Sequence, residues 1–110
     1  MPFVPISELE QREETVTSGS TITISSDAET SYRLGYYIIN ARNETENKSK
    51  SLILMVNRTD GALSSSLFAK LGVIDMEISE ISSAGNVLIR LKNNELFTLT
   101  VTVGQLILGG

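Results

Sequence analysis

The strongest constraint on the fold is the alternation of apolar and polar residues that runs through the last third of the chain. Residues 86–91 read N-V-L-I-R-L, and residues 97–103 read F-T-L-T-V-T-V. Side chains point alternately to opposite faces of a β-strand, so a period of two predicts strands with one buried face. The side chains expected to face the core are Val87, Ile89, Leu91, Phe97, Leu99 and Val101.

These two strands are expected to form an antiparallel hairpin, because Asn93 and Asn94 between them are turn residues. A three-residue loop, Lys92–Asn94, would place Ile89 opposite Phe97. Directly opposed residues of an antiparallel pair share a face. A two-residue turn would set inward residues opposite outward ones, so the longer loop is preferred.

Further strands are predicted upstream, within residues 17–26, 31–42, 51–57 and 73–81. The third of these is apolar on both faces, as in a strand covered on each side. Gly35, in the middle of the second, suggests a bulge or a close backbone approach. Residues 62–72 carry Leu at helical spacing, and a loop with one helical turn is expected there.

Six or seven such strands with short connections predict an all-β fold, an antiparallel β-sandwich of the jelly-roll type. A chain of 110 residues matches one domain. Residues 16–110 are assigned to the sandwich and residues 1–15 to an N-terminal arm. Ser7 and Glu10 match a capping box, which predicts a short helix over about residues 8–14.

The chain has more apolar surface than one sandwich interior can hold, which is typical of subunit contacts. We therefore expect an obligate homo-oligomer. The arm residues either fold back onto the domain or insert into a neighbouring copy, and an apolar tail follows Val103. The residues expected to bind partners are Phe3, Val4 and Ile6 in the arm and Leu106, Ile107 and Leu108 in the tail.

The absence of His and Cys excludes Ser-His and Cys-His catalysis and the commonest metal ligands. We expect no enzyme, no catalytic or metal residues and no cofactor. Asp75 and Glu77 could in principle form a catalytic carboxylate pair, but a solvated strand face is the better interpretation. An alternative function is carbohydrate binding through Tyr32, Tyr36 and Tyr37.

The net charge of −4 argues against nucleic-acid binding, which requires a basic surface. No apolar run approaches the roughly 20 residues of a membrane helix. The N-terminus lacks the basic start and apolar stretch of a secretion signal, so synthesis in the cytoplasm is expected.

Residues 60–103 resemble the C-terminal half of small all-β structural proteins of tailed-bacteriophage virions. The resemblance lies in the strand pattern and in the turn residues Gly85, Asn86, Asn93 and Asn94. It implies a virion component of a tail, fibre, baseplate or capsid decoration, in contact with other virion proteins. It also implies a homotrimer, and it carries no functional residues over.

Overall fold

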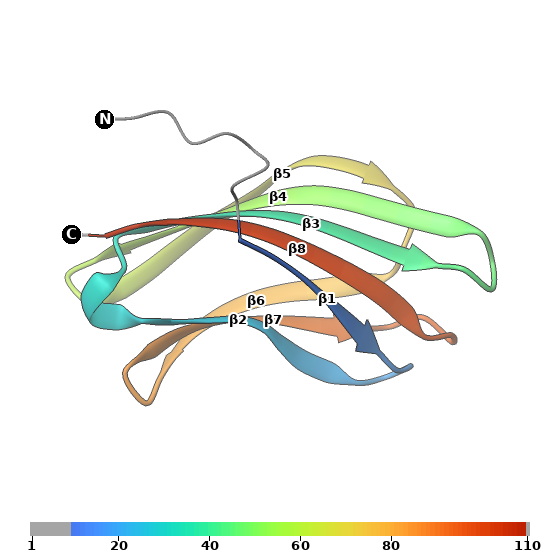
Figure 1. Cartoon of the computed structure of the whole chain (residues 1–110), viewed down its shortest axis with the longest axis horizontal. Helices are drawn as coiled ribbons and strands as arrows, with labels where there is room; N and C mark the ends of the chain where they lie inside the picture. Colours follow the sequence, from blue (N-terminus) through green and yellow to red (C-terminus); the bar gives the residue numbers. More distant parts are fainter. Residues whose placement is uncertain (1–9, 110) are drawn as a thin grey trace.

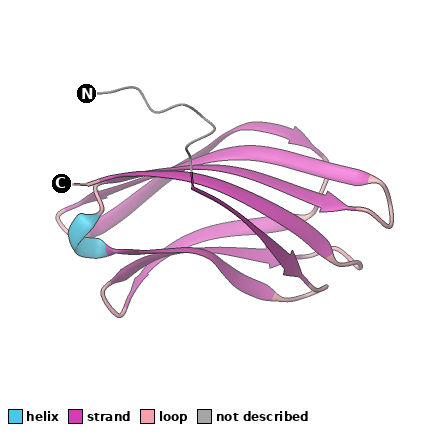
Figure 2. Ribbon diagram, viewed as in Figure 1, coloured by secondary structure: helices cyan, strands magenta, loops and turns pink. Residues whose placement is uncertain are grey.

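The computed structural model describes residues 10–109, which form two antiparallel sheets packed face to face (Figure 1). The five-stranded sheet has the order β1-β8-β3-β4-β5, and the three-stranded sheet has the order β2-β7-β6. Apart from one short turn of 3-10 helix, η2, the regular structure is all strand (Figure 2). The elements are β1 (Glu10–Val16), β2 (Thr21–Ala28), η2 (Glu29–Ser31), β3 (Leu34–Asn43), β4 (Lys48–Thr59), β5 (Ala62–Gly72), β6 (Met76–Ser83), β7 (Asn86–Asn93) and β8 (Leu99–Leu108).

The predicted antiparallel β-sandwich is confirmed, with more strands than the six or seven expected. Strands β3, β4 and β5 follow one another within one sheet, whereas the connections on either side of them cross between the sheets. The jelly-roll form of the sandwich remains a prediction.

The core lies between the inner faces of the two sheets, where buried side chains alternate with outward ones as the period of two predicts. The inward positions expected on β7 and at the start of β8 are confirmed, but Phe97 lies in the connection between them and is exposed. Buried residues on the central strands are Tyr37, Ile39, Ala41, Leu52, Leu54, Val56, Val87, Ile89, Leu91, Leu99, Val101 and Val103.

The expected hairpin between β7 and β8 is wrong, because the two strands belong to different sheets. β7 pairs with β2 and β6, whereas β8 pairs with β1 and β3. The buried side chain of Asn93 holds the connection: its Nδ2 donates to the carbonyl oxygens of Val16 and Phe97, each at 2.9 Å. Its Oδ1 accepts from the backbone N–H of Glu95 at 2.8 Å.

The helix expected over about residues 8–14 is also wrong, since residues 10–16 form β1 along the edge of β8. On the side of β1 that faces the core, Arg12 donates from Nη2 to Oε1 of Gln105 at 3.0 Å. A helix cap stabilises by only about 1 kcal/mol, and pairing along the whole of β1 outweighs it. The expected boundary between residues 15 and 16 falls inside this strand.

Residues 62–72 form the edge strand β5 in place of the expected loop. A spacing of four residues is even, so Leu63 and Leu67 share a strand face just as they would share a helix face. The strand bulges opposite Leu52, where the pairing with β4 shifts register, and Ala69 has a positive φ of 52°. The bulge turns Leu71 to the other face.

Gly35 marks a close approach, as its place in the strand suggested. A Cβ atom there would collide with the Tyr32 hydroxyl and would lie 2.7 Å from the Tyr37 ring. The hydroxyls of Tyr32 and Tyr37 are 2.7 Å apart in a buried hydrogen bond. Tyr32 precedes β3 and faces the core, whereas Tyr36 within β3 points outward.

Candidate functional site

The outer face of the five-stranded sheet, turned away from the three-stranded sheet, carries a continuous apolar surface that we call the outer patch. On each of its strands the side chains between the buried positions point outward. All but two members are half-buried, while Phe68 and Leu108 are just over a third exposed, at 38% and 37%. The outer patch consists of Leu34, Tyr36, Ile38, Ile53, Met55, Phe68, Leu106 and Leu108.

Strand register brings these residues side by side from distant parts of the sequence. Tyr36 pairs with Leu106 on one side and with Met55 on the other. In the next row Ile53 pairs with Ile38 and with Phe68. Cross-strand neighbours on one face lie about 5 Å apart, so the rows form one surface.

A hollow of about 310 Å³ lies at the β5 side of the outer patch. Leu34 and Met55 line it together with Asn57 and the serines Ser64–Ser66. It is large enough for one apolar side chain of a partner, and its serines and amide add hydrogen-bonding groups at the rim.

Only part of the predicted partner-binding set falls on this surface. Leu106 and Leu108 lie in the outer patch, but on a strand inside the sheet and not in a separate tail. Ile107 points to the inner face and packs against the core. Phe3, Val4 and Ile6 lie outside the described residues.

Sequence reasoning missed the contributions of β3 and β4 to the outer patch. The signal was present, since Tyr36, Ile38, Ile53 and Met55 make their strands apolar on both faces. A second apolar face predicts a cover on each side of a strand. Only the register shows that these faces meet those of β8.

A polar cluster joins three loops at one end of the sandwich. Nζ of Lys48 lies 2.7 Å from Oε1 of Glu95, and Asn43 donates to the same oxygen at 3.3 Å. Oε2 of Glu95 accepts the backbone N–H of Asp75 at 3.0 Å. The hydrogen bond from Lys48, with the backbone N–H of Asp75, lowers the pKa of Glu95, and the bond to Glu95 raises the pKa of Lys48.

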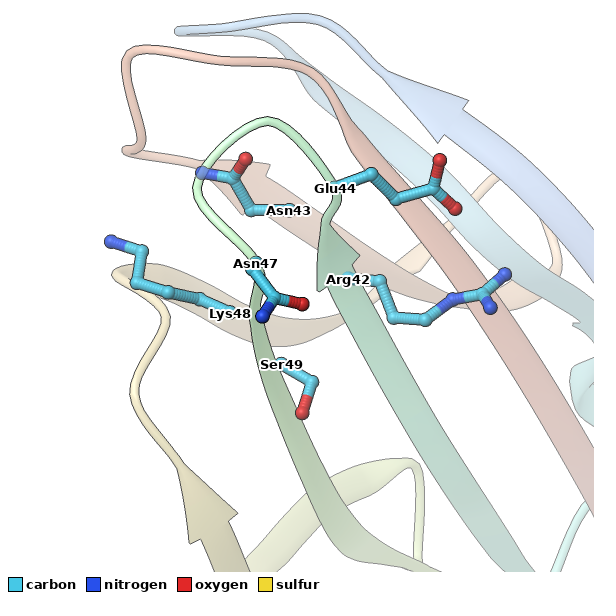
Figure 3. Close-up of a pocket in the computed structure, with 6 residues that line it drawn as sticks. All are labelled: Arg42, Asn43, Glu44, Asn47, Lys48 and Ser49. Carbon is cyan, nitrogen blue, oxygen red and sulfur yellow. The ribbon is translucent and has the colours of Figure 1, made fainter.

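The β3–β4 turn beside this cluster borders a second hollow, of about 340 Å³. Figure 3 shows Asn43 and Lys48 on one side of the hairpin and Arg42 and Glu44 on the other. These side chains diverge and do not surround a common point. The cluster of Lys48, Asn43 and Glu95 joins the loops through these contacts.

The two carboxylates considered for catalysis, Asp75 and Glu77, are exposed. Nδ2 of Asn94 lies 3.4 Å from an oxygen of Asp75 and 3.3 Å from an oxygen of Glu77. Nζ of Lys92 is 4.0 Å from Glu77. Glu77 therefore lies on a solvated face of β6, whereas Asp75 lies in the connection before that strand and not on its face.

The three tyrosines considered for carbohydrate binding do not form one surface. Tyr32 and Tyr37 are buried against each other, and burial raises the pKa of both phenols. Tyr36 alone faces outward, in the outer patch, because neighbours along a strand point to opposite faces.

Within residues 10–109, no group of three or more acidic, His or Cys side chains is arranged to hold a metal ion. The same part of the chain contains no helix long and apolar enough to cross a membrane.

No protein-family model matches the sequence, and no curated protein matches it. The fold is similar to part of the tailspike protein of Acinetobacter phage vB_ApiP_P1, with a TM-score of 0.61 and 16% identity. The match covers 97% of this chain and 24% of the tailspike chain, so this chain spans about a quarter of that protein's length. This similarity in fold agrees with the all-β phage structural proteins that residues 60–103 resemble in sequence.

Proposed function

We propose that this chain is a non-enzymatic structural or assembly protein of a tailed-bacteriophage virion. It acts by packing its sandwich against copies of itself and against other virion proteins in a tail, fibre, baseplate or capsid decoration. The observation that carries the proposal is the outer patch, which joins apolar side chains from β3, β4, β5 and β8.

The outer patch supports a packing role because apolar surface of this extent on a soluble domain usually marks a protein contact. Polar residues border it: Asn40 and Ser51 pair with each other in the row beyond Ile38. An apolar centre within a polar rim is the usual anatomy of a protein interface.

Two further observations support a phage virion. The fold resembles part of a phage tailspike, and the strand and turn pattern of residues 60–103 resembles small phage structural proteins. The proposal that the chain is not an enzyme rests on the lack of His and Cys in its sequence. The trimer implied by the resemblance remains a prediction.

The proposed contacts are Leu106 and Leu108 in the outer patch and Phe3, Val4 and Ile6 in the N-terminal arm. Ile107 is omitted because it packs against the core.

The decisive experiment measures the native mass of the chain at micromolar concentration, with wild type beside Tyr36→Ser/Leu106→Ser. We expect an oligomer for wild type and at least tenfold weaker association for the variant, because buried anchor residues dominate interfaces. Asn40→Ser, in the polar rim, is the matched control and keeps the oligomer. A wild-type monomer would refute self-assembly.

The virion location has a separate test. Antibodies against the chain should label purified particles of the encoding phage in electron microscopy. Particles that lack the chain would remove the virion role, whatever its oligomeric state.

A further inference from the structure

The two open sheets leave edges at β1, β5, β2 and β6 within the described chain. An edge strand exposes backbone N–H and C=O groups that can pair with another chain, and proteins block such edges with charges and bulges. Three of these edges are blocked in that way. The blocking features are Arg12, Glu13 and Glu14 on β1, Asp27 and a register shift on β2, and Glu77 and Glu80 on β6.

The first part of β5, Ala62–Phe68, is different. It carries no charged residue. Its pairing with β4 is regular over this stretch, between the turn at Asp60–Gly61 and the bulge at Ala69. Its side chains are exposed except for Leu63, which is half-buried against the core. This stretch is therefore a regular edge without charged residues of its own, and Oγ of Ser65 donates to Oε1 of Glu80 on β6 at 2.6 Å.

The stretch is also self-complementary. It reads A-L-S-S-S-L-F, with Ser65 at its centre. In an antiparallel pair with a copy of itself, centred on Ser65, Leu63 meets Leu67 and Ser64 meets Ser66. Ala62 meets Phe68, so apolar residues oppose apolar ones and serine opposes serine.

The faces of the sheet match in this register as well. Leu63 and Leu67 both point to the inner side of β5, since they pair with Arg58 and the buried Leu54 of β4. Ser64 and Ser66 both point outward, opposite Asn57 and Met55. Directly opposed residues must share a face, and this register satisfies that requirement.

We propose that Ala62–Phe68 is the self-association edge, and that it pairs antiparallel with the same stretch of a second copy about a twofold axis at Ser65. The contact rests on the proposed function, because it names the partner for one surface of the assembly. Each copy supplies the same stretch, Ala62–Phe68, as an isologous interface requires.

Pairing at β5 would join the two five-stranded sheets into one and place the two outer patches on the same side. A twofold contact alone gives a dimer. A twofold combined with a threefold axis gives a hexamer, so the contact is compatible with the trimer that the resemblance implies.

The test uses opposite charges on the outward serines. Ser64→Lys/Ser66→Lys places lysine opposite lysine across the axis, and Ser64→Glu/Ser66→Glu places glutamate opposite glutamate. Like charges directly opposed on a sheet are destabilising. In native mass measurements we expect each variant to have half the wild-type mass. A mixture of the two variants should regain the wild-type mass, with both chains present.

Ser79→Lys/Ser83→Lys is the matched control, because both serines are exposed on the edge strand β6 of the other sheet. It should keep the wild-type mass, and circular dichroism should show folded β structure for every variant. If the wild type is an oligomer, for example a trimer, and both charge variants keep its mass, the β5 contact is overturned. The proposed assembly would then stay intact. A wild-type monomer overturns both.

Discussion

Gly35 illustrates how one residue position depends on what packs against it. The Tyr32 hydroxyl occupies the space that a side chain at residue 35 would need. The sequence predicted a close approach or a bulge here, because glycine inside a strand pattern usually has one of these causes. It did not reveal the neighbour, since Tyr32 lies outside β3 and turns inward after η2.

We predict that Gly35→Ala destabilises the fold by about 1–3 kcal/mol, the usual cost of overpacking a core. Gly104→Ala is the matched control, because it also lies inside a strand and its nearest non-neighbouring atom, Gln11 Cγ, is 3.9 Å away. Urea unfolding of the two variants and wild type measures the difference. Equal stability of the two variants would contradict the close packing.

Glu95 is a second residue whose role comes from its neighbours. The hydrogen bonds from Lys48 and from the backbone N–H of Asp75 lower its pKa. A carboxylate whose pKa is lower in the folded state stabilises the protein above its unfolded pKa of about 4.3, and this contribution is lost as the pH falls through the folded pKa.

We predict that Glu95→Gln lowers the free energy of unfolding by about 1 kcal/mol at pH 7. The difference from wild type should vanish at about pH 2, where the carboxyl of the wild type is protonated. Urea unfolding at both pH values measures this. Glu44→Gln, exposed in the β3–β4 loop, is the control and should keep the wild-type free energy of unfolding at pH 7. A loss of equal size at both pH values would contradict the role of the charge.

At the scale of the element, a period of two in the sequence predicts which side chains face inward, but it does not identify the neighbouring strand. The inward residues of β7 and β8 were predicted, whereas their pairing was wrong. An adjacent pair of alternating strands forms a hairpin only when the connection keeps both in one sheet, and here the buried Asn93 directs the chain to the other sheet. The helix predicted over about residues 8–14 failed for a related reason. A capping box indicates a local preference for helix, but it does not show whether the edge of a strand is free for pairing.

We predict that Asn93→Ala destabilises the protein by about 2–3 kcal/mol, because it removes the donor to the carbonyl oxygen of Val16 in a buried setting and the donor to that of Phe97 in a partly buried one. Asn94→Ala is the matched control. Its side-chain contacts, at 3.3 and 3.4 Å to exposed carboxylates, are longer, and a change below about 0.5 kcal/mol is expected. Thermal or urea unfolding distinguishes them, and similar losses would contradict the assigned role.

At the scale of the whole molecule, the sequence predicted a surplus of apolar surface, and the structure gathers part of it on one sheet face, while the highly exposed Val73 and Leu96 lie in connections between strands. The location of the outer patch was not predictable, because it depends on register between strands far apart in the chain, such as Tyr36 beside Leu106. The residues expected to form a tail belong to β8 for the same reason. Leu106 and Leu108 are apolar in either case, and only the pairing with β3 shows that they lie within a sheet.

We predict that a chain ending at Val103 does not fold, because it removes the part of β8 that pairs with Leu34–Ile38 of β3. Loss of the cooperative unfolding transition in circular dichroism is the expected result. Deletion of residues 109–110 is the control and should keep the transition. A folded chain ending at Val103 that has lost only its assembly would restore the interpretation as a tail.

The position of β8 between β1 and β3 also has a consequence for biosynthesis. β1 is translated well before its partner strand β8. The five-stranded sheet therefore cannot close while residues 99–108 are still inside the ribosomal exit tunnel, and β1 and β3 must wait without the strand that joins them. Until β8 has emerged from the tunnel, β1 and β3 depend on chaperones or on their own solubility.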